Sequence, residues 1–319
     1  MNRRDALILA SLTAATGTSL LAGCGGSDTV TPPVMANIVQ LAQATPSLSI
    51  LVEAVVAADL AATLSGPGPY TVFAPNNDAF GALLTELGVT KAALLANKPL
   101  LTAVLSYHVL GAKVERAGVP IGKAITPLRG GVFKVEAPAG VLTITDGRNR
   151  TSKILATDVQ ASNGVVHIID KVILPADKDI VQTAQSISDF TTLVSAVAAA
   201  DLVATLKSAG PFTVFAPTNA AFIASLSAIG VAAAGDLLLP ANKAVLVSIL
   251  TYHVVSGRVL KADIVPATPI KTVQGDTFSI STAFAITDQR GRTANITATD
   301  VFATNGVIHV IDRVILPKA

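Results

Sequence analysis

The sequence predicts an α+β fold that is present twice in tandem, and three observations support this prediction. Long blocks of the 319-residue chain recur at a fixed offset, which indicates an internal repeat. Within each copy, residues with helical spacing come early and strand-like runs come late. The chain is also long enough for about two domains, each of which can bury a core of its own.

Two sequence blocks define the repeat. TVFAPNNDAF begins at Thr71 and returns as TVFAPTNAAF at Thr213, while NGVVHIIDKVILP begins at Asn163 and returns as NGVIHVIDRVILP at Asn305. Both blocks are offset by 142 residues (213 − 71 and 305 − 163). A repeat of this length is a whole domain and not a solenoid unit, so each copy is expected to fold by itself.

A third block fixes the limits of the two copies. SYHVL at Ser106 returns as TYHVV at Thr251, an offset of 145 (251 − 106), so the second copy gains three residues before this block and loses three after it. Such changes belong in loops. We assign residues 37–175 to the first domain and residues 179–319 to the second, which leaves a linker of three residues.

The early part of each copy is predicted to be helical. The apolar residues from Leu48 to Val55 keep helical spacing, and a Gly-Pro pair then breaks the chain before a short strand at residues 70–73. Asn76 is expected to cap the next helix, and Thr218 takes this position in the second copy. A helix therefore gives way to a strand and then to another helix.

The later part of each copy is predicted to be rich in strands. A helix around residues 100–105 leads into a strand at 107–110, and Asn163-Gly164 is expected to form the tight turn of a hairpin. The last strand, residues 165–174, is apolar on both faces at most positions, as expected in the middle of a covered sheet.

The predicted hairpin brings a carboxylate close to an imidazole. Its register places Asp158 one diagonal step from His167 on the same face of the sheet, and Asp300 in the same relation to His309. We hypothesise a hydrogen bond between the carboxylate and the ring in each copy. Both aspartates would then stabilise the fold.

The N-terminus is predicted to be an export signal that ends at a lipidated cysteine. Two arginines and an apolar stretch lead to Leu-Ala-Gly-Cys at residues 21–24, which resembles the lipobox of bacterial lipoprotein precursors. Residues 1–23 are assigned as the signal peptide, Cys24 as the residue that carries acyl chains such as palmitate, and residues 24–36 as a flexible tether. The protein is expected to be exported and lipid-anchored, at the outer membrane or cell surface or in the periplasm.

Composition excludes one class of partner. The net charge is only +2, and no cluster of lysine and arginine is interleaved with aromatic residues, so nucleic acid is not expected to bind.

The ordered blocks TVFAPxNxAF, YH and NGVxHxID, the last ending in VILP, occur in both copies and together resemble the fasciclin (FAS1) domain. The resemblance implies a wedge or sandwich of β-strands flanked by several helices. It also implies a role in adhesion to cells or matrix, without catalytic activity or a cofactor. The motif residues to which we assign structural roles are Asn77, Asn219, Asn163, Gly164, His167, Asn305, Gly306 and His309.

The resemblance also implies candidate binding residues. In animal relatives, integrin binding is attributed to an Asp-Ile pair before the NGVxH block and to the surroundings of the YH pair. The matching residues here are Asp158, Val159, Tyr107, His108, Asp300, Val301, Tyr252 and His253, so that Val replaces Ile in both copies. In each Tyr-His pair, one residue is expected to face inward and the other to lie nearer the surface. A buried hydrogen bond that fixes the junction of helix and strand is expected for the histidines ahead of contact with a ligand.

The function predicted from these observations is adhesion or matrix contact, with a cell-surface or matrix protein or a polysaccharide as partner. The alternative is a periplasmic lipoprotein that binds a small apolar ligand or has a structural role. No catalytic residue, metal site or cofactor is expected, because the chain has no GxSxG, HExxH or phosphate-binding glycine motif. An open surface would favour adhesion, and an enclosed apolar cavity would favour ligand binding.

Overall fold

The computed structural model describes residues 35–318. The predicted signal peptide, Cys24 and most of the tether lie outside the described residues. Helices and strands make up 39% and 25% of the structure, and the predicted α+β class is confirmed.

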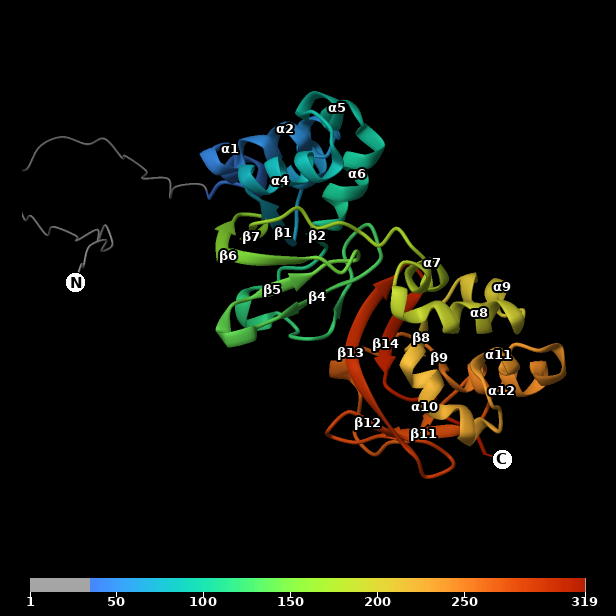
Figure 1. Cartoon of the computed structure of the whole chain (residues 1–319). Coiled ribbons are helices and arrows are strands. Elements are labelled where there is room, and N and C mark those ends of the chain that lie inside the picture. Colours follow the sequence, from blue (N-terminus) through green and yellow to red (C-terminus); the bar gives the residue numbers. More distant parts are fainter. Residues whose placement is uncertain (1–34, 319) are drawn as a thin grey trace, which may run out of the picture. The chain divides into compact units, whose positions relative to one another are not determined.

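The helices of the first domain gather over one part of its sheet, around strands β1, β2 and β7 (Figure 1). Asn76 caps the fourth helix as predicted, because its side chain accepts a hydrogen bond from the Ala79 N–H at 2.8 Å. The helices are α1 (Ile38–Gln43), α2 (Ser49–Ala57), α3 (Ala61–Ser65), α4 (Asn77–Leu87), α5 (Lys91–Ala96) and α6 (Lys98–Tyr107).

The first sheet has seven strands in the order β2-β1-β7-β6-β5-β4-β3. The pairing of β1 with β7 is parallel and the other pairings are antiparallel. The strands are β1 (Tyr70–Pro75), β2 (Val109–Leu110), β3 (Ala124–Ile125), β4 (Phe133–Glu136), β5 (Thr143–Thr145), β6 (Thr151–Ala161) and β7 (Gly164–Ile169). Strand β7 lies inside the sheet, as its apolar sequence predicts.

The second domain repeats this order of elements. Its seven strands follow the order β10-β11-β12-β13-β14-β8-β9, and β8 pairs with β14 in parallel. The helices are α7 (Ile180–Gln185), α8 (Thr191–Ala199), α9 (Val203–Lys207), α10 (Asn219–Ile229), α11 (Ala234–Leu237) and α12 (Lys243–Tyr252). The strands are β8 (Phe212–Pro217), β9 (Val254–Ser256), β10 (Ile270–Lys271), β11 (Thr277–Ile280), β12 (Ala285–Thr287), β13 (Thr293–Ala303) and β14 (Gly306–Ile311).

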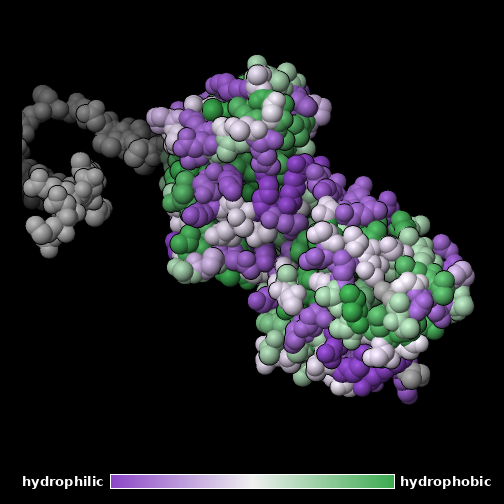
Figure 2. Space-filling view, viewed as in Figure 1, coloured by the Kyte–Doolittle hydropathy of each residue, from purple (hydrophilic) through white to green (hydrophobic). Residues whose placement is uncertain are grey.

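The core of each domain has two parts, because the central strands are covered on both faces. In β1, Val72 packs in the cluster formed with the helices, whereas Phe73 packs in a second cluster with Phe133 at a ring distance of 5.3 Å. Successive side chains of a strand point to opposite faces, which explains this division. On the face shown in Figure 2, hydrophobic and hydrophilic residues are interspersed.

Three predictions about local structure are corrected. The hairpin turn lies one residue earlier than predicted, because Ala161 pairs with Gly164. The last strand ends at Ile169, not at residue 174. Tyr107 ends helix α6 and does not begin a strand, and His108 caps that helix.

Glycine at position 164 is required by a close approach between strands and not by the turn. A Cβ atom on Gly164 would lie 2.1 Å from the Tyr70 carbonyl oxygen of β1, a distance that no side chain tolerates. Gly306 has the same relation to Phe212 in the second domain, at 2.2 Å. The Asn-Gly pair therefore fixes the pairing of β7 with β1.

Candidate functional site

The candidate binding residue Asp158 lies on a bulge in strand β6. The pairing of β6 with β7 shifts between Ala156 and Val159, and Asp158 has a positive φ of 59°. Asp300 repeats this conformation with a φ of 62°. A bulge redirects the side chains of the bulged strand, so the bulge decides where each aspartate side chain points.

The predicted Asp–His pairs do meet, but through different atoms. The backbone N–H of Asp158 donates to Nδ1 of His167 at 3.2 Å, and Nε2 of that ring contacts the Val114 carbonyl at 2.9 Å. The ring is therefore neutral, with its proton on Nε2. The hypothesis of a carboxylate–imidazole hydrogen bond is wrong, because the bulge directs the carboxylate elsewhere. Oδ1 of Asp158 accepts from the backbone N–H of Arg116 at 2.7 Å.

The second domain shares this arrangement. The Asp300 N–H donates to Nδ1 of His309 at 3.2 Å, and the carboxylate accepts from the Lys261 N–H at 2.8 Å. The distance between the carboxylate and the ring, from Oδ1 to Nδ1, is 4.0 Å, which is beyond a hydrogen bond.

The two aspartates differ in their exposure. Asp158 is half-buried, whereas Asp300 is only 3% exposed. Oδ2 of Asp300 forms an ion pair of 2.8 Å with Nζ of Lys134, which comes from strand β4 of the first domain. Burial opposes the charge on Lys134, but hydrogen bonds to Asp300 and Glu136 raise its pKa above the ordinary value. Both oxygens of Asp300 are thus occupied.

The valines that follow the two aspartates face inward. Val159 is half-buried and packs against the helix-covered core of the first domain. Val301 does the same in the second domain.

The Tyr-His pairs are buried completely, which corrects the prediction that one member lies near the surface. Tyr107 and Tyr252 have no exposed surface, and the two histidines are each 1% exposed. The Tyr107 hydroxyl donates to the Val132 carbonyl, and Tyr252 donates to the Thr277 carbonyl at 2.9 Å. These four candidate binding residues have internal partners instead of a free surface.

Both ring nitrogens of His108 are used by the backbone. Nδ1 lies 2.7 Å from the Val104 carbonyl of helix α6, and Nε2 accepts from the Ile173 N–H at 3.0 Å. Burial lowers the pKa of His108 to about 4, and burial does the same to His253, whose contacts are equivalent. Both rings are neutral and tie a helix to the segment after the last strand. Neither has a free nitrogen to activate a serine hydroxyl.

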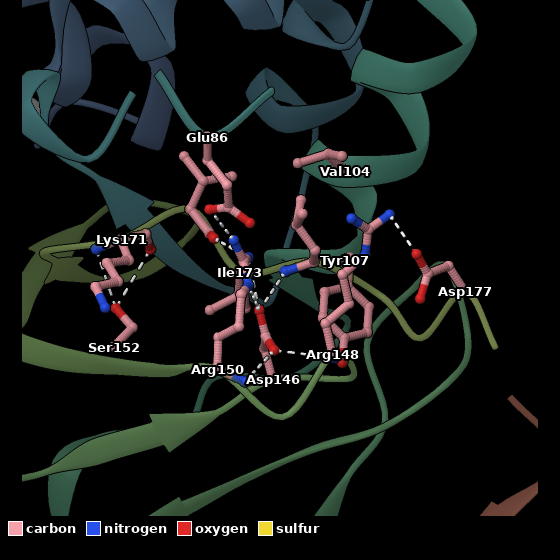
Figure 3. A network of polar contacts seen from close by, with 12 residues as sticks. Glu86, Val104, Tyr107, Asp146, Arg148, Arg150, Ser152, Lys171, Ile173 and Asp177 are labelled. Atoms are coloured by element: carbon pink, nitrogen blue, oxygen red, sulfur yellow. Dashed lines mark hydrogen bonds and ion pairs between the residues drawn. The ribbon is translucent and has the colours of Figure 1, made fainter. Parts of the chain in front are cut away.

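A buried carboxylate beside the Tyr-His pair organises a larger polar network (Figure 3). Oδ2 of Asp146 accepts from the Leu174 N–H at 2.9 Å and from Nη2 of Arg150 at 2.7 Å. The same guanidinium reaches the Val172 carbonyl at 2.8 Å and Glu86 at 2.7 Å. Asp288 and Arg292 repeat the core of this network in the second domain.

The sequence motifs do not predict this network, because none of them includes Asp146. The signal was present in the repeat, since Asp146 and Arg150 recur as Asp288 and Arg292, 142 residues later. A charged pair that recurs in both copies beside buried strands indicates a structural ion pair.

The motif asparagines also form internal hydrogen bonds. Asn163 accepts from the Ile38 N–H at 3.0 Å and donates to the carbonyls of Leu64 and Gly66, each at 2.8 Å. Asn77 accepts from the Ile50 N–H at 3.0 Å. Asn305 and Asn219 make the matching bonds in the second domain.

Within residues 35–318, no group of three or more His, Cys, Asp or Glu side chains is arranged to hold a metal ion. In the same part of the chain, no helix is long and apolar enough to cross a membrane.

The fold and these repeated networks define a tandem pair of α+β domains of one kind. The model of the fasciclin domain matches residues 46–175 and again residues 188–317. The chain therefore belongs to the fasciclin domain family, as the resemblance of its motifs predicts.

Several known proteins are similar to this chain. Transforming growth factor-beta-induced protein ig-h3 of Oryctolagus cuniculus is 33% identical over 258 residues, which cover 80% of this chain and 36% of the rabbit protein. Protein sll1483 of Synechocystis sp. is 46% identical over 140 residues, which cover 43% of this chain and 73% of that protein. Human periostin is 28% identical over 264 residues, which cover 81% of this chain and 28% of periostin. The chain thus spans about a third of the length of the animal relatives.

A solved structure of a FAS1 domain pair from the insect cell adhesion molecule fasciclin I aligns with a TM-score of 0.43 at 18% identity. The alignment covers 85% of this chain and 97% of the insect chain.

Proposed function

We propose that this protein is a lipid-anchored, non-enzymatic adhesion protein that contacts a cell surface or matrix through the Asp158 bulge of its first domain. One observation supports this site above the other candidates. Oδ2 of Asp158 has no hydrogen-bond partner among residues 35–318, and its side chain reaches the surface. The corresponding oxygen of Asp300 is bound to Lys134.

The charges around Asp158 indicate the chemistry of the partner. Glu115 lies beside the bulge, because Gln160 hydrogen-bonds to both Glu115 and the Asp158 carbonyl at 3.3 Å. Lys113 forms an ion pair with Glu115 at 3.1 Å, whereas the carboxylate of Asp158 forms no ion pair with any residue between 35 and 318. A partner that presents a basic side chain or polysaccharide hydroxyl groups would complete its hydrogen bonding.

We expect the substitution Asp158→Asn to weaken adhesion several-fold without changing the thermal midpoint. Beads coated with the purified chain would be counted on cells that lack the gene. The matched control is Asp189→Asn, which changes an exposed carboxylate of the second domain. Equal binding of wild-type, Asp158→Asn and uncoated beads would refute adhesion. Loss of binding by both variants would refute the assignment to Asp158.

The anchor is tested separately with Cys24→Ser. We expect the intact chain to fractionate with membranes and to be cleaved by protease added to whole cells, while the variant is released. Release follows because the thiol carries the acyl chains. If the intact chain were protected from protease, the protein would lie in the periplasm and not at the cell surface.

A second candidate function is the binding of a small apolar ligand. It is favoured by a cavity of about 280 Å³ in the first domain, between helices α4, α5 and α6 and the segment after strand β7.

A further inference from the structure

The cavity of the first domain has apolar walls and a charged mouth. Its volume is about 280 Å³, and its apolar lining includes Phe80, Leu83, Leu94, Leu101, Val104 and Leu174. Arg129, Arg148 and Asp177 also line it. An apolar cavity of about 150 Å³ holds one benzene ring, so this cavity has room for roughly ten to twelve non-hydrogen atoms.

The two arginines have unused donors. Arg148 points toward Asp177 (Figure 3), with 3.1 Å between Nη2 and the carboxylate. Its Nε is buried without a hydrogen-bond partner in the part of the chain that the structure describes. The side chain of Arg129 is exposed and makes no ion pair or hydrogen bond with residues 35–318. A buried donor without a partner is costly, and an anion at the mouth would satisfy it.

The charge at the mouth favours an anion with a single negative charge. Two arginines and one aspartate line the cavity, which leaves one positive charge for a ligand to neutralise. Arginine donors bind carboxylates with short, charge-assisted hydrogen bonds. A carboxylate can approach Arg129 and Nε of Arg148 while Asp177 keeps Nη2.

In the second domain, the arginine equivalent to Arg148 uses its donors for internal hydrogen bonds. Arg290 stands 142 residues after Arg148, and its guanidinium donates to the carbonyls of Pro317 and Ala228, each at 3.2 Å. The position that corresponds to Arg129, at the offset of 145, is Gln274. The positive mouth is therefore a property of the first domain.

We infer that the cavity binds a small amphipathic carboxylate, with its hydrocarbon part among the leucines and its carboxylate at Arg129 and Arg148. A medium-chain fatty acid has this size and charge. The inference names the ligand class of the second candidate function, and it does not depend on adhesion through Asp158.

The test uses the full chain with Cys24→Ser, which avoids acylation, and titrates decanoate below its micellar concentration by calorimetry. We expect one decanoate per chain. Arg129→Gln and Arg148→Gln should each raise the dissociation constant at least tenfold, since a hydrogen bond to a charged group is lost. Arg290→Gln in the second domain should leave it unchanged. Decanol, which has no charge, should bind more weakly and should not respond to either arginine.

A variant that fills the cavity tests whether decanoate binds inside the cavity or on the surface of the protein. Ala103→Phe should abolish binding of both ligands by occupying the cavity, and circular dichroism would establish that each variant is folded. Equal affinities for decanoate and decanol, or equal affinities of the wild type and both first-domain arginine variants, would overturn the inference. If decanoate did not bind and the coated beads adhered normally, the carboxylate inference would be refuted and the adhesion proposal would stand.

Discussion

Replacement of Asp146 by alanine should lower the free energy of unfolding of the first domain by about 3–5 kcal/mol. This carboxylate is 1% exposed and accepts hydrogen bonds from Arg150 and from the backbone N–H groups of Arg148 and Leu174. Its removal leaves the Arg150 guanidinium, which is largely buried, with only the exposed Glu86 as a counterion. Urea titration followed by circular dichroism would measure the change.

Two variants serve as comparisons for this prediction. Glu86→Ala removes a carboxylate that is 47% exposed, so it should cost less than about 1 kcal/mol. Asp288→Ala removes the equivalent buried carboxylate of the second domain and should destabilise that domain to a similar extent. If Asp146→Ala cost no more than Glu86→Ala, the network would not be a major source of stability.

Mild acid should destabilise both domains through their buried histidines. Burial lowers the pKa of His108 and of His253 to about 4 in the folded protein, from an ordinary value of 6.5. As the pH falls below 6.5, the unfolded chain binds protons that the folded chain does not. Stability is therefore complete above about pH 6.5, falls down to about pH 4, and loses about 3 kcal/mol per histidine over this range.

The test compares the pH dependence of unfolding in the wild type and in His108→Gln. The variant should be less stable at pH 7, because Val104 and Ile173 lose their partner. It should also show a shallower slope between pH 6.5 and pH 4 for the first domain only. His253→Gln should have the same effect on the second domain. Parallel slopes in the wild type and the variants would contradict the assignment of acid sensitivity to these rings.

The repeat, the order of elements and the helix caps could be predicted from sequence because they depend on local signals. Asn76 caps α4, and Thr218 caps α10, since a short polar side chain at this position needs only the backbone of the next turn. The internal position of β7 follows from its continuous apolar run. The family was predicted from three ordered motifs, and the matches at residues 46–175 and 188–317 confirm it.

The details of the candidate site depend on contacts between distant segments. The bulge at Asp158 moves the carboxylate from the ring of His167 to the backbone of Arg116, a change that a regular register does not predict. The burial of Tyr107 and His108 depends on residues far away in the sequence, including Phe133 of β4 and the segment at Ile173 after the last strand. The unused Nε of Arg148 also depends on distant contacts, because the equivalent Arg290 finds an acceptor in the Pro317 carbonyl and Arg148 does not.

The ion pair between Lys134 and Asp300 has a consequence for valency. If the aspartate motif is an attachment point, as proposed for Asp158, its two copies would offer two such points. Lys134 occupies the aspartate of the second copy, so the proposal implies a single attachment point in each chain. A monovalent molecule gains no avidity by itself. Strong attachment would then depend on how densely the chains are displayed on one surface, so that many weak contacts form together.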